Sequence, residues 1–147
     1  MRERFFGFAL SAMLFALCFS IQAQQPTKVP RVGFLTGASL SAQLVRNEAF
    51  RQGLRELGYV EGKNIVIEWR SYEGREDRSP ALAAELVRLK VDVIVTGGSG
   101  DIRAAKEATA TIPIVMVQGG DPVGSGFVAS LSRPGSNITG LSTLRPS

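Results

Sequence analysis

After residue 30 the chain alternates between two patterns of apolar and polar positions. Short, mostly apolar runs indicate strands, and longer segments with apolar residues at every third or fourth position indicate helices. This alternation with short connections predicts a parallel sheet with helices on both faces and right-handed crossovers. The predicted strands are 31–36, 64–72, 91–96 and 112–118, and the predicted helices are 41–57, 79–89 and 101–110.

The character of each run predicts its place in the sheet. Segments 93–95 and 114–117 are continuously apolar, as in strands buried on both faces. Segment 64–72 carries charged residues on one of its two faces, which favours an edge strand. With a short fifth strand at 138–141, the prediction is one α/β domain with a doubly wound parallel sheet in the flavodoxin-like order 2-1-3-4-5. We also expect a short helix at 127–131.

The predicted strands end at glycines and small polar residues. In a parallel sheet all carboxyl ends lie along one edge, and ligands bind there. We therefore expect a ligand-binding rim on that edge. Its candidate binding residues are Thr36, Ser39, Tyr72, Thr96, Gly98, Ser99, Gln118 and Asp121.

Two positions on this rim have a structural alternative. The Gly97–Gly100 loop leads into a helix, whose first N–H groups can receive a carboxylate, but it is equally explained as a turn capped by Ser99 or Asp101. Asp121 follows two glycines and precedes a proline, so it can pair with a ligand ammonium or cap the following turn. Both interpretations stay open at each position.

The first 30 residues have the layout of a secretory leader. A short basic segment precedes an uncharged apolar run at 5–19, and Ala23 precedes a polar stretch. We expect cleavage after Ala23, with 1–23 as signal peptide and 24–30 as linker. Cys18, the one cysteine, would leave with the leader, which suits an oxidising periplasm.

Composition excludes several kinds of chemistry. The sequence has no histidine, so Ser-His-Asp catalysis and histidine zinc sites are excluded. The glycine loop is neither a dinucleotide fingerprint nor a P-loop. The 17 basic and 13 acidic residues are interleaved, and no basic run with aromatics suggests nucleic acid. We expect no enzyme activity, no cofactor, no metal and no nucleic-acid partner.

Four stretches resemble one family. Segments 58–65, 93–101, 114–123 and 130–140 together resemble the substrate-binding component of a bacterial ABC importer, of the type I periplasmic-binding-protein kind. The resemblance implies a periplasmic receptor for a small organic ligand, such as an aromatic amino acid, that meets the membrane only through a permease. It also implies two lobes, of which 31–141 would be the first and 142–147 a truncated crossover. The alternatives are a flavodoxin-like nucleotide-binding or enzyme domain, or a truncated product without function.

Overall fold

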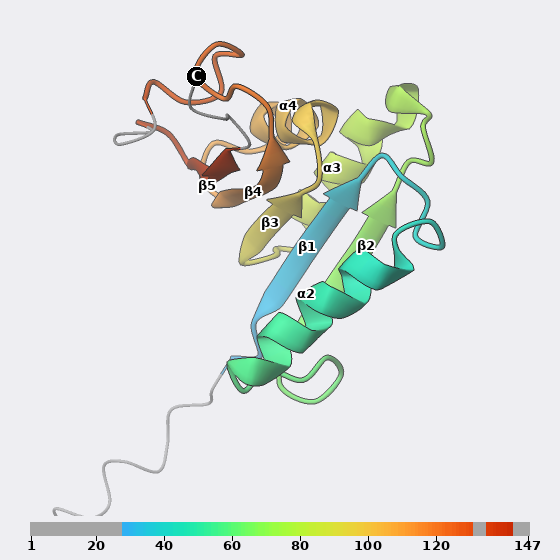
Figure 1. Ribbon diagram of the computed structural model, residues 1–147. Helices are drawn as coiled ribbons and strands as arrows, with labels where there is room; N and C mark the ends of the chain where they lie inside the picture. The colour runs from blue at the N-terminus through green and yellow to red at the C-terminus, as the bar shows by residue number, and fades with distance from the viewer. Residues whose placement is uncertain (1–27, 131–134, 143–147) are drawn as a thin grey trace, which may run out of the picture.

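The computed structural model describes residues 28–130 and 135–142. Five strands form one sheet: β1 (Arg31–Thr36), β2 (Val66–Ser71), β3 (Val93–Thr96), β4 (Ile114–Gly119) and β5 (Ile138–Ser142). Three α-helices and one 3₁₀ turn connect them: α2 (Leu44–Glu56), η1 (Glu76–Arg78), α3 (Ser79–Arg88) and α4 (Ser99–Ala108). Figure 1 shows α2 on one face of the sheet and α3 and α4 on the other.

The sheet is parallel throughout and has the order β2-β1-β3-β4-β5. This confirms the predicted fold class and strand order. β1 lies in the middle and pairs with β2 on one side and with β3 on the other. The ladder of β4 with β5 is irregular between Met116 and Gly119.

The larger core lies between the sheet and helices α3 and α4. Its strand residues include Leu35, Ile94 and Ile114, which have no exposed surface. Leu86 of α3 and Ile102 of α4 cover them and are equally buried. Full burial of such a side chain stabilises the fold by about 1.5–3 kcal/mol, so this layer is the main source of stability.

A smaller aromatic core lies on the opposite face, beneath α2. Phe34 of β1 stacks on Trp69 of β2 at 4.8 Å between ring centroids and meets Phe50 of α2 edge-on at 5.5 Å. Leu54 packs against the same cluster. Helix α2 ends at Glu56, and Gly58, just beyond the C-cap residue Leu57, has a φ of +89°, the left-handed conformation that glycine adopts without strain.

The charged second strand lies at the edge, as predicted. Arg70 points away from the aromatic core, and its guanidinium pairs with Glu85 of α3 at 3.0 Å. Arg31 of β1 lies 3.7 Å from Glu68 of β2. The charges on β2 therefore serve to fasten this edge to its neighbours.

The predicted helix at 127–131 is wrong over the residues that the structure describes. Residues 127–130 form no helix. The backbone N–H groups of Phe127 and Val128 both donate to the carbonyl of Pro122, and Gly126 has a φ of +71°. These bonds close a turn, and the side chains of Phe127 and Val128 are buried in the larger core. Leu131, like the predicted leader 1–23, lies outside the described residues.

Candidate ligand-binding rim

The carboxyl ends of β1, β2, β3 and β4 lie along one edge of the sheet, as the arrowheads in Figure 1 show. Each of the eight candidate residues lies either at the carboxyl end of one of these strands or in the segment that follows it. Thr36, Tyr72 and Thr96 are buried behind the rim, Ser39 and Gly98 lie half-buried in its loops, and Ser99 and Asp121 are exposed on its surface.

The loop after β1 is held by the buried Thr36. Its Oγ1 accepts hydrogen bonds from Nε2 of Gln43 at 3.0 Å and from the backbone N–H of Ala38 at 3.3 Å. Ser39 lies further along and accepts a bond from the backbone N–H of Ala42 at 3.2 Å. These bonds explain why α2 begins at Leu44 rather than at Ser41, because residues 40–43 are taken up by the turn.

Tyr72 is wedged between two rim loops. Only 6% of its surface is exposed. Its hydroxyl lies so close to Gly37 and Gly100 that a Cβ atom on them would approach it to 2.7 Å and 3.2 Å, respectively. The ring therefore lies behind the rim and joins the loop after β1 to the start of α4.

The glycine loop after β3 is organised by Asp101. The backbone N–H of Gly97 donates to Oδ2 of Asp101 at 3.1 Å, while Gly98, the N-cap residue of α4, has no side chain with which to cap the helix. Ser99 is therefore not a cap; it is the first residue of the helix and is exposed. Asp101 is 2% exposed, and its Oδ1 has no hydrogen-bond partner within the described residues.

Burial shifts the titration of both groups beneath this loop. It raises the pKa of the Asp101 carboxyl above its ordinary value, against the opposing effect of the Tyr72 hydroxyl and the N–H groups of Gly97 and Gly98. Burial also raises the pKa of Tyr72 well above its usual range, and the neighbouring Asp101 carboxyl adds to this shift. The Asp101 carboxyl and the Tyr72 hydroxyl therefore form a buried polar contact directly behind the glycine loop.

The remaining strand-end residues follow β3 and β4. Thr96 is fully buried, and its Oγ1 donates to the carbonyl of Val115 at 3.4 Å. Gln118 lies in β4 next to its carboxyl end. Asp121 is exposed, and its Oδ1 accepts bonds from the backbone N–H groups of Val123 at 3.1 Å and Gly124 at 2.8 Å. The structural alternative for Asp121, capping a turn, is thus realised in this structure.

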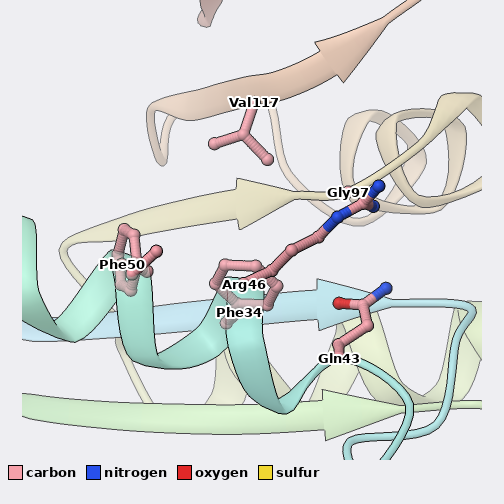
Figure 2. Close-up of a pocket in the computed structure, with 7 residues that line it drawn as sticks. Phe34, Gln43, Arg46, Phe50, Gly97 and Val117 are labelled. Atoms are coloured by element: carbon pink, nitrogen blue, oxygen red, sulfur yellow. The ribbon is translucent and has the colours of Figure 1, made fainter.

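A groove of about 400 Å³ opens beside the rim, between α2 and β4. Phe34 forms part of its lining from β1, and Val117 faces it from β4 (Figure 2). Figure 2 also shows the Arg46 side chain extending from α2 toward Gly97. Gly97 therefore borders both the rim and the groove.

Sequence reasoning missed this groove and the role of Asp101. Asp101 was predicted only as a possible cap, and its contact with Tyr72 joins residues from different strand ends. A signal was present for Asp101, since a carboxylate in the first turn of a helix after glycines is well placed to accept from the loop. No signal in the sequence singled out Arg46 or Gln43.

The described part of the chain holds neither a candidate metal cluster nor a membrane-spanning helix. No group of three or more metal-binding side chains occurs among these residues. No helix within them is long and apolar enough to cross a membrane.

The parallel sheet and its loop-lined carboxyl edge define an α/β lobe of the kind that binds small molecules at strand ends. Comparison with known proteins identifies the family. The family model for ABC transporter substrate binding proteins matches residues 32–146. The chain therefore belongs to this family, which confirms the resemblance noted in the sequence.

Individual relatives agree with this assignment. A tyrosine-binding protein of Clostridioides difficile is 35% identical over 95 residues, which are 65% of this chain and 28% of that protein. A solved conserved domain protein of Vibrio cholerae is 34% identical with a TM-score of 0.74, over 81% of this chain and 40% of the other. A Streptococcus structure in complex with L-Trp is 26% identical with a TM-score of 0.72, over 78% and 39%. The chain thus spans less than half the length of these relatives.

Proposed function

We propose that this chain is the first lobe of a solute receptor for an ABC importer, and that it holds a small zwitterionic ligand at its rim without chemical conversion. The observation that carries the proposal is that the Gly97–Ser99 loop and the Asp121 turn follow the neighbouring parallel strands β3 and β4 at one edge of the sheet, in a chain that belongs to this family. The L-Trp complex and the tyrosine-binding relative support an aromatic amino acid as the ligand class. A permease of the importer would be the membrane partner, and the periplasm the compartment.

The residues have different roles in this proposal. Ser99, the first residue of α4, would offer its N–H group to the ligand carboxylate, and Gly98, which has no side chain, would let the ligand approach; the helix dipole contributes about 0.3–1 kcal/mol there. Asp121 would pair with the ligand ammonium through Oδ2, because the N–H groups of the turn donate to Oδ1. Ser39 and Gln118 would add polar contacts. Thr36, Tyr72 and Thr96, which are buried, would support the loops from behind.

The contacts that one lobe can make set the affinity expected of the 147-residue chain. A single lobe leaves one side of a bound ligand in water, where charge pairs are weak. We therefore expect weak binding by this chain and tight binding only when a second lobe closes over the ligand. The affinity of the chain alone also distinguishes a receptor from a nucleotide-binding domain, because such a domain would bind a nucleotide through one lobe.

Calorimetry tests the proposal. L-Tyr, L-Trp, L-Leu and ATP are titrated into the 147-residue chain and into a joined protein, in which the chain continues after Ser147 into the remainder of the Vibrio cholerae relative. We expect tight binding of an aromatic amino acid only by the joined protein. Asp121→Ala should weaken it, and Glu56→Ala, an exposed carboxylate at the far end of α2, should not. Binding of ATP but of no amino acid would contradict the proposal.

A further inference from the structure

Asp101 is a buried carboxyl that has no cationic partner among the described residues. It is 2% exposed and lies in the first turn of α4, and none of the ion pairs in the described part of the chain includes it. Its polar neighbours are neutral: the N–H groups of Gly97 and Gly98 and the hydroxyl of Tyr72. A buried carboxylate without a cation is costly, so burial raises the pKa of this group.

The two oxygens of this carboxyl have different surroundings. Oδ2 accepts the hydrogen bond from the backbone N–H of Gly97 at 3.1 Å, whereas Oδ1 has no hydrogen-bond partner within the described residues. An ionised carboxylate would leave Oδ1 as a buried acceptor without a donor. A neutral carboxylic acid carries its proton on one oxygen and accepts through the other. The arrangement therefore suits the neutral acid, with the glycine loop held as it is.

The same carboxyl lies directly behind the loop that faces a ligand. A Cβ atom on Gly97 would lie 3.3 Å from Oδ2 of Asp101, and one on Gly98 would lie 3.7 Å from it. Ser99, two positions before Asp101, is exposed and is the first residue of α4. A ligand carboxylate at the N–H of Ser99 is therefore separated from Asp101 only by the loop backbone. Two negative charges placed there repel each other and compete for the positive end of the same helix dipole.

We propose that Asp101 is a positioning residue that couples ligand binding to proton uptake: the rim receives a ligand carboxylate together with one proton from solvent, which is held on Asp101. The inference rests on the proposed placement of that carboxylate at the start of α4. By linkage, the protonated carboxyl strengthens ligand binding, and the bound ligand strengthens proton binding by the same factor. Affinity therefore rises as the pH falls through the titration range of Asp101.

A small cavity brings solvent-sized space close to this carboxyl. Tyr72, whose hydroxyl contacts Asp101, lines a cavity of about 180 Å³. The cavity is large enough for water, so a proton can reach Asp101 through water and the Tyr72 hydroxyl. The start of α3 contributes no charged group to the lining. The charged groups that face the cavity or extend toward the glycine loop are Glu76 of η1, Arg103 and Glu107 of α4, and Arg46 of α2 (Figure 2).

Calorimetry of the joined protein with L-Trp at pH 5, 6 and 7 tests the coupling, because L-Trp keeps both of its charges in this range. We expect wild type to bind about fivefold or more tightly at pH 5 than at pH 7, the lower end of typical coupling between two sites. Asp101→Asn keeps an acceptor for Gly97 and all the other charged groups but cannot ionise. It should show wild-type affinity at pH 5 and lack this pH dependence. Glu56→Gln, at the far end of α2, should keep the wild-type profile.

The outcomes separate the coupling from the receptor. The same pH profile in wild type and Asp101→Asn would overturn the coupling and leave the receptor in place. No binding of an aromatic amino acid by the joined protein at any pH would overturn the receptor, and the coupling with it.

A second measurement needs neither the variant nor the joined protein. The amide resonance of Gly97 in the 147-residue chain is followed by NMR against pH, with and without millimolar L-Trp. Its titration midpoint should move to higher pH with L-Trp, because the bound carboxylate favours the proton on Asp101. An unmoved midpoint at a concentration that shifts the Ser99 amide would overturn the coupling. No response of Ser99 to L-Trp would contradict the placement of the ligand carboxylate and therefore both proposals.

Discussion

The backbone N–H of Gly97 donates a 3.1 Å hydrogen bond to Oδ2 of Asp101. This bond fixes the glycine loop that follows β3 to the first turn of α4. The carboxyl that accepts it is almost completely buried and is in contact with Tyr72. The position of the glycine loop on the rim therefore depends on the buried carboxyl of Asp101.

We predict that Asp101 makes stability fall as the pH rises. The pKa of Asp101 is raised in the folded state, so the folded chain holds this proton more tightly than the unfolded chain. Its contribution is fully present below the unfolded value of 3.8 and is lost as the pH rises through the higher folded value. Urea unfolding of wild type and Asp101→Asn at pH 4 to 7 measures this contribution.

The Asn variant keeps an acceptor for Gly97 and cannot ionise, so the difference between the two proteins should favour wild type most at the acid end of the series. A difference that is independent of pH would contradict this prediction. Asp101→Ala cannot ionise either and removes the acceptor as well, so it should be about 1–3 kcal/mol less stable than Asp101→Asn at every pH.

A pair of glycine substitutions tests the close packing of Tyr72. A Cβ atom on Gly37 would lie 2.7 Å from the Tyr72 hydroxyl, whereas one on Gly53 would meet nothing within 4 Å. Gly37→Ala should therefore destabilise the chain by about 1–3 kcal/mol through overpacking. Gly53→Ala, inside α2, should stabilise it by about 0.5–1 kcal/mol. Thermal unfolding by circular dichroism compares the two, and equal shifts would show that Tyr72 is not wedged at Gly37.

Asn137 should anchor β5 to the loop between α4 and β4. Its Nδ2 donates to the carbonyl of Ile112 at 2.7 Å and to that of Thr109 at 3.3 Å. Asn137→Ala leaves both carbonyls without this donor and should cost about 1–3 kcal/mol in urea unfolding. Ser136→Ala is the control, since the Ser136 hydroxyl accepts a long bond, of 3.3 Å, from the nearby backbone N–H of Ile138. An equal or larger loss in the control would contradict the anchoring role.

The sheet could be predicted because buried parallel strands carry their own signal. Segment 114–117 has no polar position, and the alternation of apolar and charged residues in β2 indicates an edge strand. Both features depend on the immediate environment of each strand. The order 2-1-3-4-5 followed from them, and it was confirmed.

The details of the rim could not be predicted in the same way. Tyr72 and Asp101 are 29 positions apart, and their contact depends on how two loops fold over the ends of β1 and β3. The apolar pair Phe127–Val128 was misread as a helix, because burial beneath a turn leaves the same local pattern as burial on a helix face. The groove beside α2 depends on which helix is absent from a face, and no local pattern records that.

The predicted leader has a direct test. Secretion in a bacterial host should yield a periplasmic protein whose N-terminal sequence begins at Gln24, because a small residue at Ala23 suits the processing enzyme. Ala23→Leu should slow cleavage, and Ala9→Leu, within the apolar run, should not. A protein that keeps Met1 and stays in the membrane would contradict the signal peptide.

Asp121 offers a way to separate a structural role from ligand binding. Its Oδ1 already accepts from the backbone N–H groups of Val123 and Gly124. Asparagine can retain this turn through its side-chain oxygen, but it carries no charge for a ligand ammonium. We therefore expect the free energy of unfolding of Asp121→Asn to lie within about 0.5 kcal/mol of the wild-type value. For Asp121→Ala it should be lower by about 0.5–1.5 kcal/mol.

In the joined protein the same two variants should behave alike in ligand binding. Both remove the negative charge, so calorimetry should show both binding the aromatic amino acid at least about tenfold more weakly, the equivalent of roughly 1.4 kcal/mol. Wild-type affinity in Asp121→Asn, with loss only in Asp121→Ala, would show that Asp121 shapes the rim through its turn and does not pair with the ligand.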